Sequence, residues 1–461
     1  MAVFGKIAKW AIAVLAVIVI AAAAWLYFAP PALIRVATAY SAKMVCSNAF
    51  LASRPGDQVM SIDVQAPGHP LLGYVSANVD PVARTVTAGL LGVFGRSQTV
   101  YRNGTGCAVV PDGDVTAANL PDLGYLPSPD IAALWPQGER VELSTDPRLA
   151  QILDDPAMTG EGMRAIVVVQ NGRIVGERYG VAFNDLTPLL GWSMTKTVTA
   201  ALIGILVRDE RLSLDQSDLF EAWSVDERAE IEIADLMAMS SGLEFNEDYG
   251  DVTDVTRMLY LQPDMAEFAA DKPFAGPRGE TFSYSSGTSV LLSRVWQNAF
   301  DDPDAALAWP REALFGPLGM TSATLEADAR GTFVGSSYLY ATAHDWARFG
   351  EFLRNDGVWD GEQILPEGYV AWMREAAPAS EGTYGRGQLW LRGPDAGTPE
   401  GEDPDAGFDL PDDTFWLLGH DGQSIAVVPS RGLVVVRMGL TPSKLGYKPQ
   451  AMVEALLGVL E

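Results

Sequence analysis

The chain has 461 residues, and its acidic side chains outnumber the basic ones by 59 to 32, which gives a formal net charge of -27 at pH 7. Hydrophobic residues make up 48% of the chain, enough for a large core and roughly two or three structural units. An acidic surface of this kind repels phosphate backbones, so nucleic acid is excluded as an expected partner. The acidic excess is otherwise typical of a solubility or salt adaptation and indicates nothing about a reaction.

The first predicted element is an apolar run from Trp10 to Phe28, preceded by Lys6 and Lys9 and followed by Pro30-Pro31. Its length is close to the about 20 residues with which a helix crosses a bilayer. We expect an uncleaved membrane anchor over residues 1–30, because bulky side chains occupy the place of a cleavage site. A cleaved signal peptide is the alternative. The two lysines favour a cytoplasmic N-terminus, which predicts a single-pass inner-membrane protein with the bulk of the chain in the periplasm.

Residues 31–145 are expected to form a membrane-proximal region with strand-like runs and many Pro and Gly turns, but without recognisable chemistry. Its two cysteines, Cys46 and Cys107, are the only cysteines of the chain. We predict that they form a disulfide, since export places this region in an oxidising compartment. Two buried free thiols are the alternative.

A segment of mixed helices and strands follows. The run RAIVVVQNGRIVGERYG predicts two strands joined by Asn171-Gly172, the strongest short hairpin pattern. The run IEIADLMAMSSGL predicts a short helix ended by Gly242. A mostly helical middle, about 210–353, precedes a second β-rich run, SIAVVPSRGLVVVRMGL, and an amphipathic C-terminal segment. We expect one sheet built from both ends of this segment, with the helical middle as an insert.

The stretch GWSMTKTV places Ser193 and Lys196 three residues apart at the head of an apolar segment. On a helix these two positions share a face, so their side chains can meet. A serine hydroxyl needs a base to become a nucleophile, and a lysine in a poorly solvated pocket can give up its proton and act as that base. The alternative is structural, namely a helix-capping serine beside a lysine whose amine reaches solvent.

Two downstream segments supply further candidate groups. Tyr284 stands before another apolar helix, and a phenol near a lysine ammonium can ionise and act as a general base. An ordinary tyrosine at a helix start is the alternative. His420, Asp421 and Gly422 stand at the start of a hairpin, where glycine lets the backbone approach a ligand closely.

The fragments SMTK, LMAMSSGLEF, YSSG, LFGPLGM, YGRGQLW and GHDGQ occur in this order. Their order resembles that of the serine β-lactamase-like hydrolases, which include class C β-lactamases, D,D-peptidases, family VIII esterases and nylon-oligomer hydrolases. The resemblance implies an α+β fold over residues 146–461, with an antiparallel sheet flanked by helices and a mostly helical insert. It assigns the nucleophile and its lysine to Ser193 and Lys196, and the second-motif tyrosine to Tyr284.

The resemblance also implies an oxyanion hole made by the backbone N–H groups of Ser193 and Gln423. Two departures from the family bear on the substrate. Class C β-lactamases carry Tyr-x-Asn and Lys-Thr-Gly, whereas this chain has Ser286 in place of the asparagine and His420 in place of the lysine. Both departures remove groups that hold antibiotics, so we expect the hydrolysis of small esters or amides.

A cell-wall D,D-peptidase or β-lactamase, and a penicillin-binding-like sensor without turnover, are the alternative functions. By the same resemblance, His420, Gly422 and Ser286 are expected to bind substrate. The loop FNEDYGDVTDV resembles the substrate loop of nylon-oligomer hydrolases, which makes Tyr249 a candidate substrate contact. A loop aromatic packed on its own helix is the alternative for Tyr249.

A Ser-His-Asp triad is the rival mechanism, and only His69, His344 and His420 could serve it. His69 lies outside the catalytic region, and His344 has the sequence context of a structural residue at a helix start. Because no G-x-S-x-G pattern surrounds Ser193, the Ser-Lys-Tyr arrangement is preferred. The expected reaction needs no metal or cofactor. The acidic run at 393–413 lacks EF-hand spacing, so a solvated loop is preferred there to a calcium site.

Overall fold

The computed structural model describes residues 2–127 and 129–460, and its internal contacts divide the chain into two compact units. Unit 1 consists of Met1–Tyr101, Cys107–Thr116 and Asp248–Pro263. Unit 2 consists of Arg102–Gly106, Ala117–Glu247 and Asp264–Glu461. These limits differ from the expected boundary at residue 145, which stays a prediction about domains.

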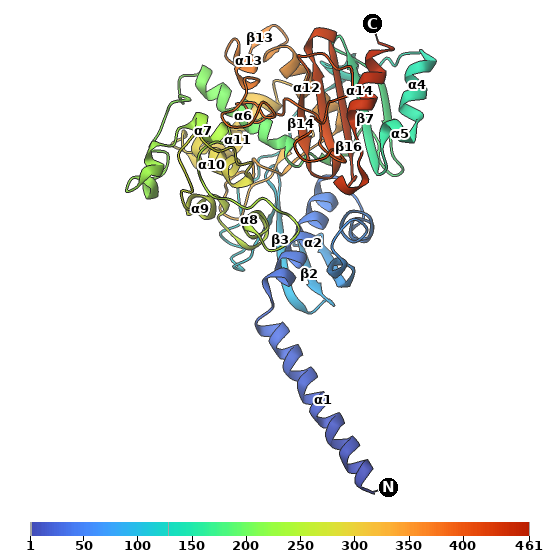
Figure 1. Cartoon of the computed structure of the whole chain (residues 1–461), viewed down its shortest axis with the longest axis vertical. Helices are drawn as coiled ribbons and strands as arrows, with labels where there is room; N and C mark the ends of the chain where they lie inside the picture. The colour runs from blue at the N-terminus through green and yellow to red at the C-terminus, as the bar shows by residue number, and fades with distance from the viewer. Residues whose placement is uncertain (1, 128, 461) are drawn as a thin grey trace. The chain divides into compact units, whose positions relative to one another are not determined.

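Unit 1 opens with α1 (Ala2–Phe28), drawn in dark blue in Figure 1. Its stretch Lys9–Phe28 is long and apolar enough to cross a membrane, and none of this stretch is buried inside the protein. Pro30 and Pro31 separate it from α2 (Ala32–Leu51), because proline lacks the backbone N–H that a continuous helix needs.

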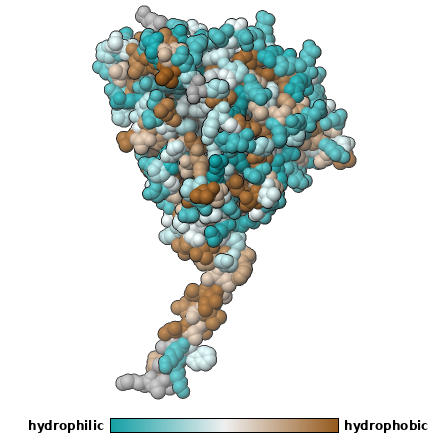
Figure 2. Space-filling model, turned by 180° about the vertical axis from the view of Figure 1, so that it is seen from behind, coloured by the Kyte–Doolittle hydropathy of each residue, from teal (hydrophilic) through white to brown (hydrophobic). Residues whose placement is uncertain are grey.

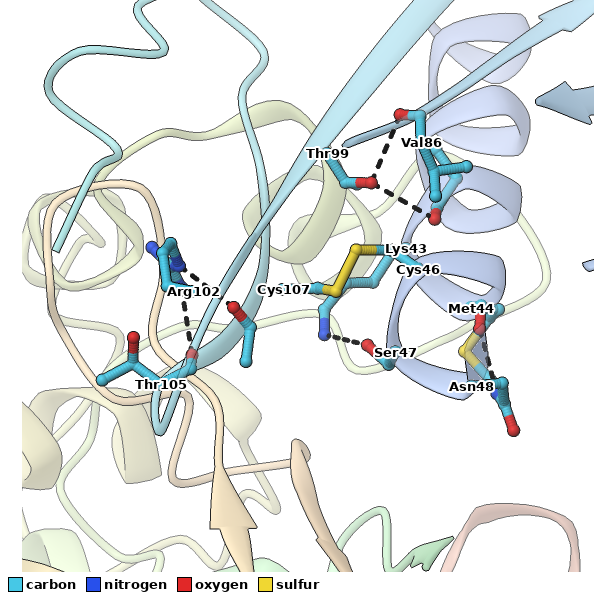
Figure 3. The surroundings of a disulfide bond; sticks show 12 residues. Lys43, Met44, Cys46, Ser47, Asn48, Val86, Thr99, Arg102, Thr105 and Cys107 are labelled. Atoms are coloured by element: carbon cyan, nitrogen blue, oxygen red, sulfur yellow. Dashed lines mark hydrogen bonds between the residues drawn. A yellow bond between two sulfur atoms is a disulfide. The ribbon is translucent and has the colours of Figure 1, made fainter. Parts of the chain in front are cut away.

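The helix α2 packs against a four-stranded sheet with the strand order β1-β2-β3-β4. The strands are β1 (Val75–Asp80), β2 (Thr85–Leu90), β3 (Phe94–Arg102) and β4 (Gly106–Val109). Unit 1 also contains α3 (Gly56–Val59), the turns η1 (Met60–Gln65) and η2 (Pro70–Tyr74), and α8 (Asp254–Leu261). Figure 3 shows the disulfide between Cys46 of α2 and Cys107 of β4, which confirms the predicted pairing across 61 residues of sequence.

The main sheet of unit 2 has five strands in the order β14-β15-β16-β7-β8, and every neighbouring pair is antiparallel. Its strands are β7 (Met163–Gln170), β8 (Arg173–Tyr179), β14 (Phe415–Gly419), β15 (Gln423–Val428) and β16 (Leu433–Gly439). This confirms that one sheet is built from both ends of the segment, as the red β14 and β16 beside the green β7 show in Figure 1. Asn171 and Gly172, at φ 50° and 76°, form the predicted hairpin turn.

Helices cover both faces of this sheet. On one face, Ile166 and Val168 of β7 pack in a cluster with Met452 and Leu456. On the other face, α12 lies against β7, β15 and β16. Because both faces are covered, the central strands are continuous hydrophobic runs rather than alternating ones.

The remaining elements of unit 2 are short strands and helices. The strands are β5 (Asp130–Leu134), β6 (Gly138–Arg140), β9 (Leu189–Leu190), β10 (Thr324–Leu325), β11 (Leu339–Ala341), β12 (Val358–Trp359) and β13 (Glu362–Gln363). The helices are α4 (Pro147–Asp154), α5 (Pro156–Thr159), α6 (Met194–Arg208), α7 (Ile233–Met237), α9 (Met265–Ala270), α10 (Ser286–Gln297), α11 (Pro303–Pro310), α12 (Ala343–Arg354), α13 (Tyr369–Met373) and α14 (Pro449–Leu457).

The helix predicted to end at Gly242 ends earlier, at Met237. Met239 adopts a φ of 56°, which a helix cannot continue through. Gly242 has a different role, because a Cβ there would lie 2.0 Å from the Gly276 carbonyl oxygen. The glycine therefore permits two backbone segments to approach each other closely.

Candidate active site

The start of α6 presents Ser193 and Lys196. Ser193 is the N-cap of α6, and Lys196 follows in its first turn. Gly191 and Trp192, just before Ser193, determine how the chain enters the helix. A Cβ on Gly191 would lie 2.2 Å from the Trp346 ring, and Trp192 adopts a φ of 48°. The helix is buried over almost its whole length, so Lys196 lies in the interior with 1% of its surface exposed.

The Lys196 amine contacts three acceptors. Its Nζ donates to Ser193 Oγ, to Ser286 Oγ and to the Ser336 carbonyl, each at 3.1 Å. These three contacts match the three N–H donors of an ammonium group. Burial lowers the pKa of Lys196 to about 8, and the Glu247 carboxylate opposes this shift. Part of the lysine is therefore neutral near pH 7 and able to accept a proton from Ser193.

Tyr284 lies beside the same lysine, with its ring centroid 4.7 Å from Lys196 Nζ. Burial raises the pKa of Tyr284 above its usual range, the Glu247 carboxylate raises it further, and a hydrogen bond with Ser193 opposes both. Tyr284 is therefore a neutral phenol in the resting site. This corrects the expectation that the lysine ammonium ionises it, since the ammonium faces the ring and burial disfavours the phenolate.

Ser286 connects the lysine to a buried carboxylate. Its Oγ donates to Glu247 Oε1 at 2.5 Å, and its backbone N–H donates to Oε2 at 2.7 Å. Burial raises the pKa of Glu247, which Lys196 opposes. A chain of hydrogen bonds thus runs from Ser193 through Lys196 and Ser286 to Glu247. We call these four residues, together with Tyr284, the catalytic cluster, after the role that we propose for them below.

Sequence reasoning missed Glu247. It stands in the loop FNEDYGDVTDV, from which only Tyr249 was selected. An acidic residue so close to a candidate substrate contact was the available signal. Tyr249 itself belongs to unit 1, whereas the catalytic cluster belongs to unit 2. Its contact with substrate stays a prediction.

The turn His420–Gly422 lies beside the residues that precede Ser193. The His420 ring packs edge-on against Trp192, with 5.4 Å between ring centroids. A Cβ on Gly419, at the end of β14, would lie 2.2 Å from the Gly191 carbonyl oxygen. The end of β14 and the segment before α6 therefore approach each other closely at Gly419 and Gly191.

Gln423 fixes the shape of this turn. Its side-chain amide donates to the His420 carbonyl at 3.1 Å and to the Gly439 carbonyl at 2.6 Å, and it accepts from the Gly439 N–H at 2.8 Å. Gly422 adopts a φ of 80°, which favours glycine. The side chain of Gln423 is thus engaged in holding the strand ends together.

The other two histidines have structural contacts. His344 Nε2 lies 2.8 Å from Glu177, and Nδ1 lies 3.4 Å from Glu139. Burial lowers the pKa of His344, but the hydrogen bonds to the two glutamates outweigh it and raise the value to about 9. His69 accepts a hydrogen bond from the Leu71 N–H at 3.1 Å, at the start of a short helical turn.

Arg348 extends this second group of charges. Its guanidinium forms ion pairs with Asp345 at 2.7 Å and with Glu139 at 2.8 Å, and its side chain is fully buried. We call His344, Glu139, Glu177, Asp345 and Arg348 the His344 cluster.

Comparisons with known proteins point to one family. A family model described as Beta-lactamase matches residues 156–447. A curated relative, the 6-aminohexanoate-dimer hydrolase of Paenarthrobacter ureafaciens, is 23% identical over 314 residues, which cover 60% of this chain and 72% of the relative.

Two solved structures share the fold. One, a Bacillus anthracis protein provisionally assigned as a 6-aminohexanoate-dimer hydrolase, is 23% identical with a TM-score of 0.53 and covers 79% of this chain and 89% of its own. The other, a penicillin binding protein from Bacillus halodurans, is 18% identical with a TM-score of 0.51 and covers 67% of this chain and 99% of its own.

Proposed function

Since the chain belongs to the Beta-lactamase family and is a serine hydrolase, we propose that it cleaves small esters or amides through an acyl-enzyme on Ser193. One observation carries this proposal: Lys196 Nζ lies 3.1 Å from Ser193 Oγ in a buried site. An amine at that distance, with its pKa lowered by burial, supplies the base that a serine hydroxyl needs.

In the acylation step, neutral Lys196 accepts the proton of Ser193 as its Oγ attacks the carbonyl carbon. The neutral Tyr284 phenol donates its proton to the leaving oxygen or nitrogen and takes a proton back from the Lys196 ammonium. In the deacylation step, neutral Lys196 accepts a proton from the attacking water. The Tyr284 phenol donates its proton to the departing Ser193 Oγ and takes a proton back from the Lys196 ammonium. Each step therefore ends with the site in its starting protonation state.

We assign the oxyanion hole to the backbone N–H groups of Ser193 and Gln423. The close approach of Gly419 to the Gly191 carbonyl, and the side-chain bonds that fix Gln423, support this assignment. Losing one donor from such a hole typically lowers the rate by about 10²–10³.

The substrate class follows from the residues around the nucleophile. Ser286 is engaged with Lys196 and Glu247, and His420 replaces the lysine that would hold a carboxylate in class C β-lactamases. The curated relative is named for the hydrolysis of 6-aminohexanoate dimer, which is an amide. Both points favour ester and amide substrates over β-lactams.

A direct test labels the chain with a fluorophosphonate and maps the adduct by mass spectrometry. Hydrolysis of a p-nitrophenyl acyl ester and of 6-aminohexanoate dimer is then measured beside nitrocefin. We expect one adduct on Ser193, ester or amide turnover, and little nitrocefin hydrolysis. Undiminished turnover by Ser193→Ala would refute the site, and dominant nitrocefin hydrolysis would favour a β-lactamase or D,D-peptidase. A burst without later turnover would favour a sensor.

We also propose that α1 anchors the chain in the inner membrane, with the catalytic unit in the periplasm. The apolar stretch Lys9–Phe28, the basic residues Lys6 and Lys9, and the disulfide support this arrangement. The chain should remain in the membrane pellet after a carbonate wash, and protease added to the periplasm should reach the catalytic unit.

A further inference from the structure

Charge is distributed unevenly along the chain. Residues 31–111, which follow α1, contain six Lys or Arg and three Asp or Glu, whereas the whole chain contains 32 and 59. Between Asp80 and Asp112 the sequence has no acidic residue. That stretch contains Arg84, Arg96 and Arg102 and is therefore basic, whereas the chain as a whole is strongly acidic. Anionic lipid head groups attract the first and repel the second.

The hairpin between β2 and β3 presents apolar side chains to solvent. Leu91 and Val93 are 64% and 49% exposed. The Val93 N–H donates to the Leu90 carbonyl at 3.1 Å and closes the turn. Leu91 and Gly92 both have positive φ, 50° and 74°, a conformation that favours Asn or Gly. The positive φ disfavours a leucine at position 91, and so does the exposure of its side chain to water. An apolar phase around this side chain removes the second cost.

Two further apolar residues lie at the same end of unit 1. The carbonyl of Tyr74, which is 65% exposed, accepts the Leu91 N–H at 2.8 Å. Leu33 is exposed on the first turn of α2. We call Leu33, Tyr74, Leu91 and Val93 the apolar tip.

The apolar tip lies where the chain leaves α1. A Cβ on Gly95 would lie 2.6 Å from Ile34 and 3.3 Å from Pro30, so β3 touches the start of α2. Thr38 Oγ1 donates to the Gly95 carbonyl at 2.5 Å and fixes this contact. Figure 2 shows the hydrophobic colour of α1 continuing onto the adjoining surface. The exposed Arg35 and Arg96 come from the same two elements.

We propose that the apolar tip inserts into the head-group layer of the bilayer that α1 spans, with Arg35 and Arg96 on the phosphates of anionic lipids. This inference rests on the proposed anchoring by α1. Aromatic and apolar side chains flanked by arginine are the composition that partitions to this layer. Unit 1 then has two attachments to the membrane and a fixed orientation on it.

The test places a probe at the tip of the full chain in nanodiscs. Both native cysteines form the disulfide, so Leu91→Cys introduces the one thiol available for a fluorescent label. The matched control is Val82→Cys, since Val82 is 93% exposed in the turn at the opposite end of β1. Six residues separate the two ends of β1, which is about 20 Å.

We expect lipids brominated close to the head group to quench the Leu91 label at least about threefold more than the Val82 label, because only the first meets the bilayer. Quenching should increase with phosphatidylglycerol content, and Arg35→Gln with Arg96→Gln should reduce that dependence. Equal quenching at the two positions would overturn the proposal.

A label at Val17→Cys in α1 separates the two proposals. A quenched Val17 label beside an unquenched Leu91 label would reject the tip contact and keep the anchor. An unquenched Val17 label would reject both. Ester hydrolysis by the labelled Leu91→Cys chain verifies that it is folded.

Discussion

The catalytic cluster and the His344 cluster both bury a cation near carboxylates in unit 2, yet they shift its pKa in opposite directions. Burial lowers the pKa of Lys196 to about 8 from 10.5. The pKa of His344 instead rises to about 9 from 6.5 against the effect of burial.

The geometry explains the difference between the two clusters. His344 contacts Glu177 directly at 2.8 Å, and Glu139 as well. Lys196 reaches Glu247 through the Ser286 hydroxyl. A direct carboxylate contact outweighs desolvation and fixes the charge, whereas a contact through a hydroxyl leaves an amine that can change its charge near neutral pH. The first arrangement suits a structural role, and the second suits the proton transfer that we propose.

The largest difference between the clusters is expected in catalysis. Lys196→Ala should lower kcat/KM for a p-nitrophenyl ester by about 10³ or more, since it removes the base for Ser193. His344→Gln should leave kcat/KM within a few-fold of the wild type. Comparable losses in the two variants would mean that the clusters do not divide the roles in this way.

For the stability of the fold, we expect the larger loss from a change in the His344 cluster. Arg348→Met should lower the free energy of unfolding by about 3–5 kcal/mol, because it leaves the buried Asp345 carboxylate without its cation. Chemical denaturation measures this loss. The control Arg178→Met removes an exposed pair with Asp154 and should have far less effect. Similar values for the two variants would contradict a structural role for the His344 cluster.

The hydroxyl of Tyr284 allows a test within the catalytic cluster. Tyr284→Phe should lower kcat by about 10² without moving the midpoint of the pH profile, because the phenol stays neutral throughout the working range. Tyr384→Phe is the control, since the Tyr384 ring packs against Tyr284 at 5.8 Å. A moved midpoint in Tyr284→Phe would show that the phenol titrates after all.

The His344 cluster should also give stability a pH dependence. The pKa of His344 is raised on folding from 6.5 to about 9, so its stabilising contribution is complete below pH 6.5 and is lost as pH rises through 9. The free energy of unfolding of His344→Gln should lack this decline. Parallel pH curves for wild type and variant, measured by denaturation, would exclude the charged histidine.

The smallest effect is expected from Glu247, whose carboxylate reaches Lys196 only through the Ser286 hydroxyl. Wild-type kcat/KM should rise with pH through about 8 as Lys196 loses its proton. Because Glu247 raises the pKa of Lys196, Glu247→Gln should move this midpoint to lower pH while keeping the shape of the side chain. An unmoved midpoint would place the titrating group elsewhere.

Local patterns predicted the parts of the fold that local physics determines. Asn171-Gly172 tolerates the positive φ of a tight hairpin turn, and the hydrophobic runs around it form β7 and β8 as expected. Helical spacing brought Ser193 and Lys196 to one face. The pairing of Cys46 with Cys107 followed from the expected oxidising compartment and from the presence of two cysteines in the sequence.

The parts that failed depend on distant segments. The role of Glu247 is set by Ser286, 39 residues later, and no spacing rule connects them. The ionisation of Tyr284 depends on burial, which a sequence pattern does not measure. Gly242 is a glycine because the Gly276 carbonyl lies against it, a contact invisible within its own helix pattern.

The Cys46–Cys107 disulfide has a consequence for proteolysis. A single cut between these cysteines, for instance at the exposed turn around Val82, leaves both fragments joined through sulfur. The nicked enzyme would stay tethered to α1 until a reductant separates it. If α1 anchors the chain as we propose, release of the hydrolase from the membrane by one protease event therefore requires cleavage before Cys46 or beyond Cys107.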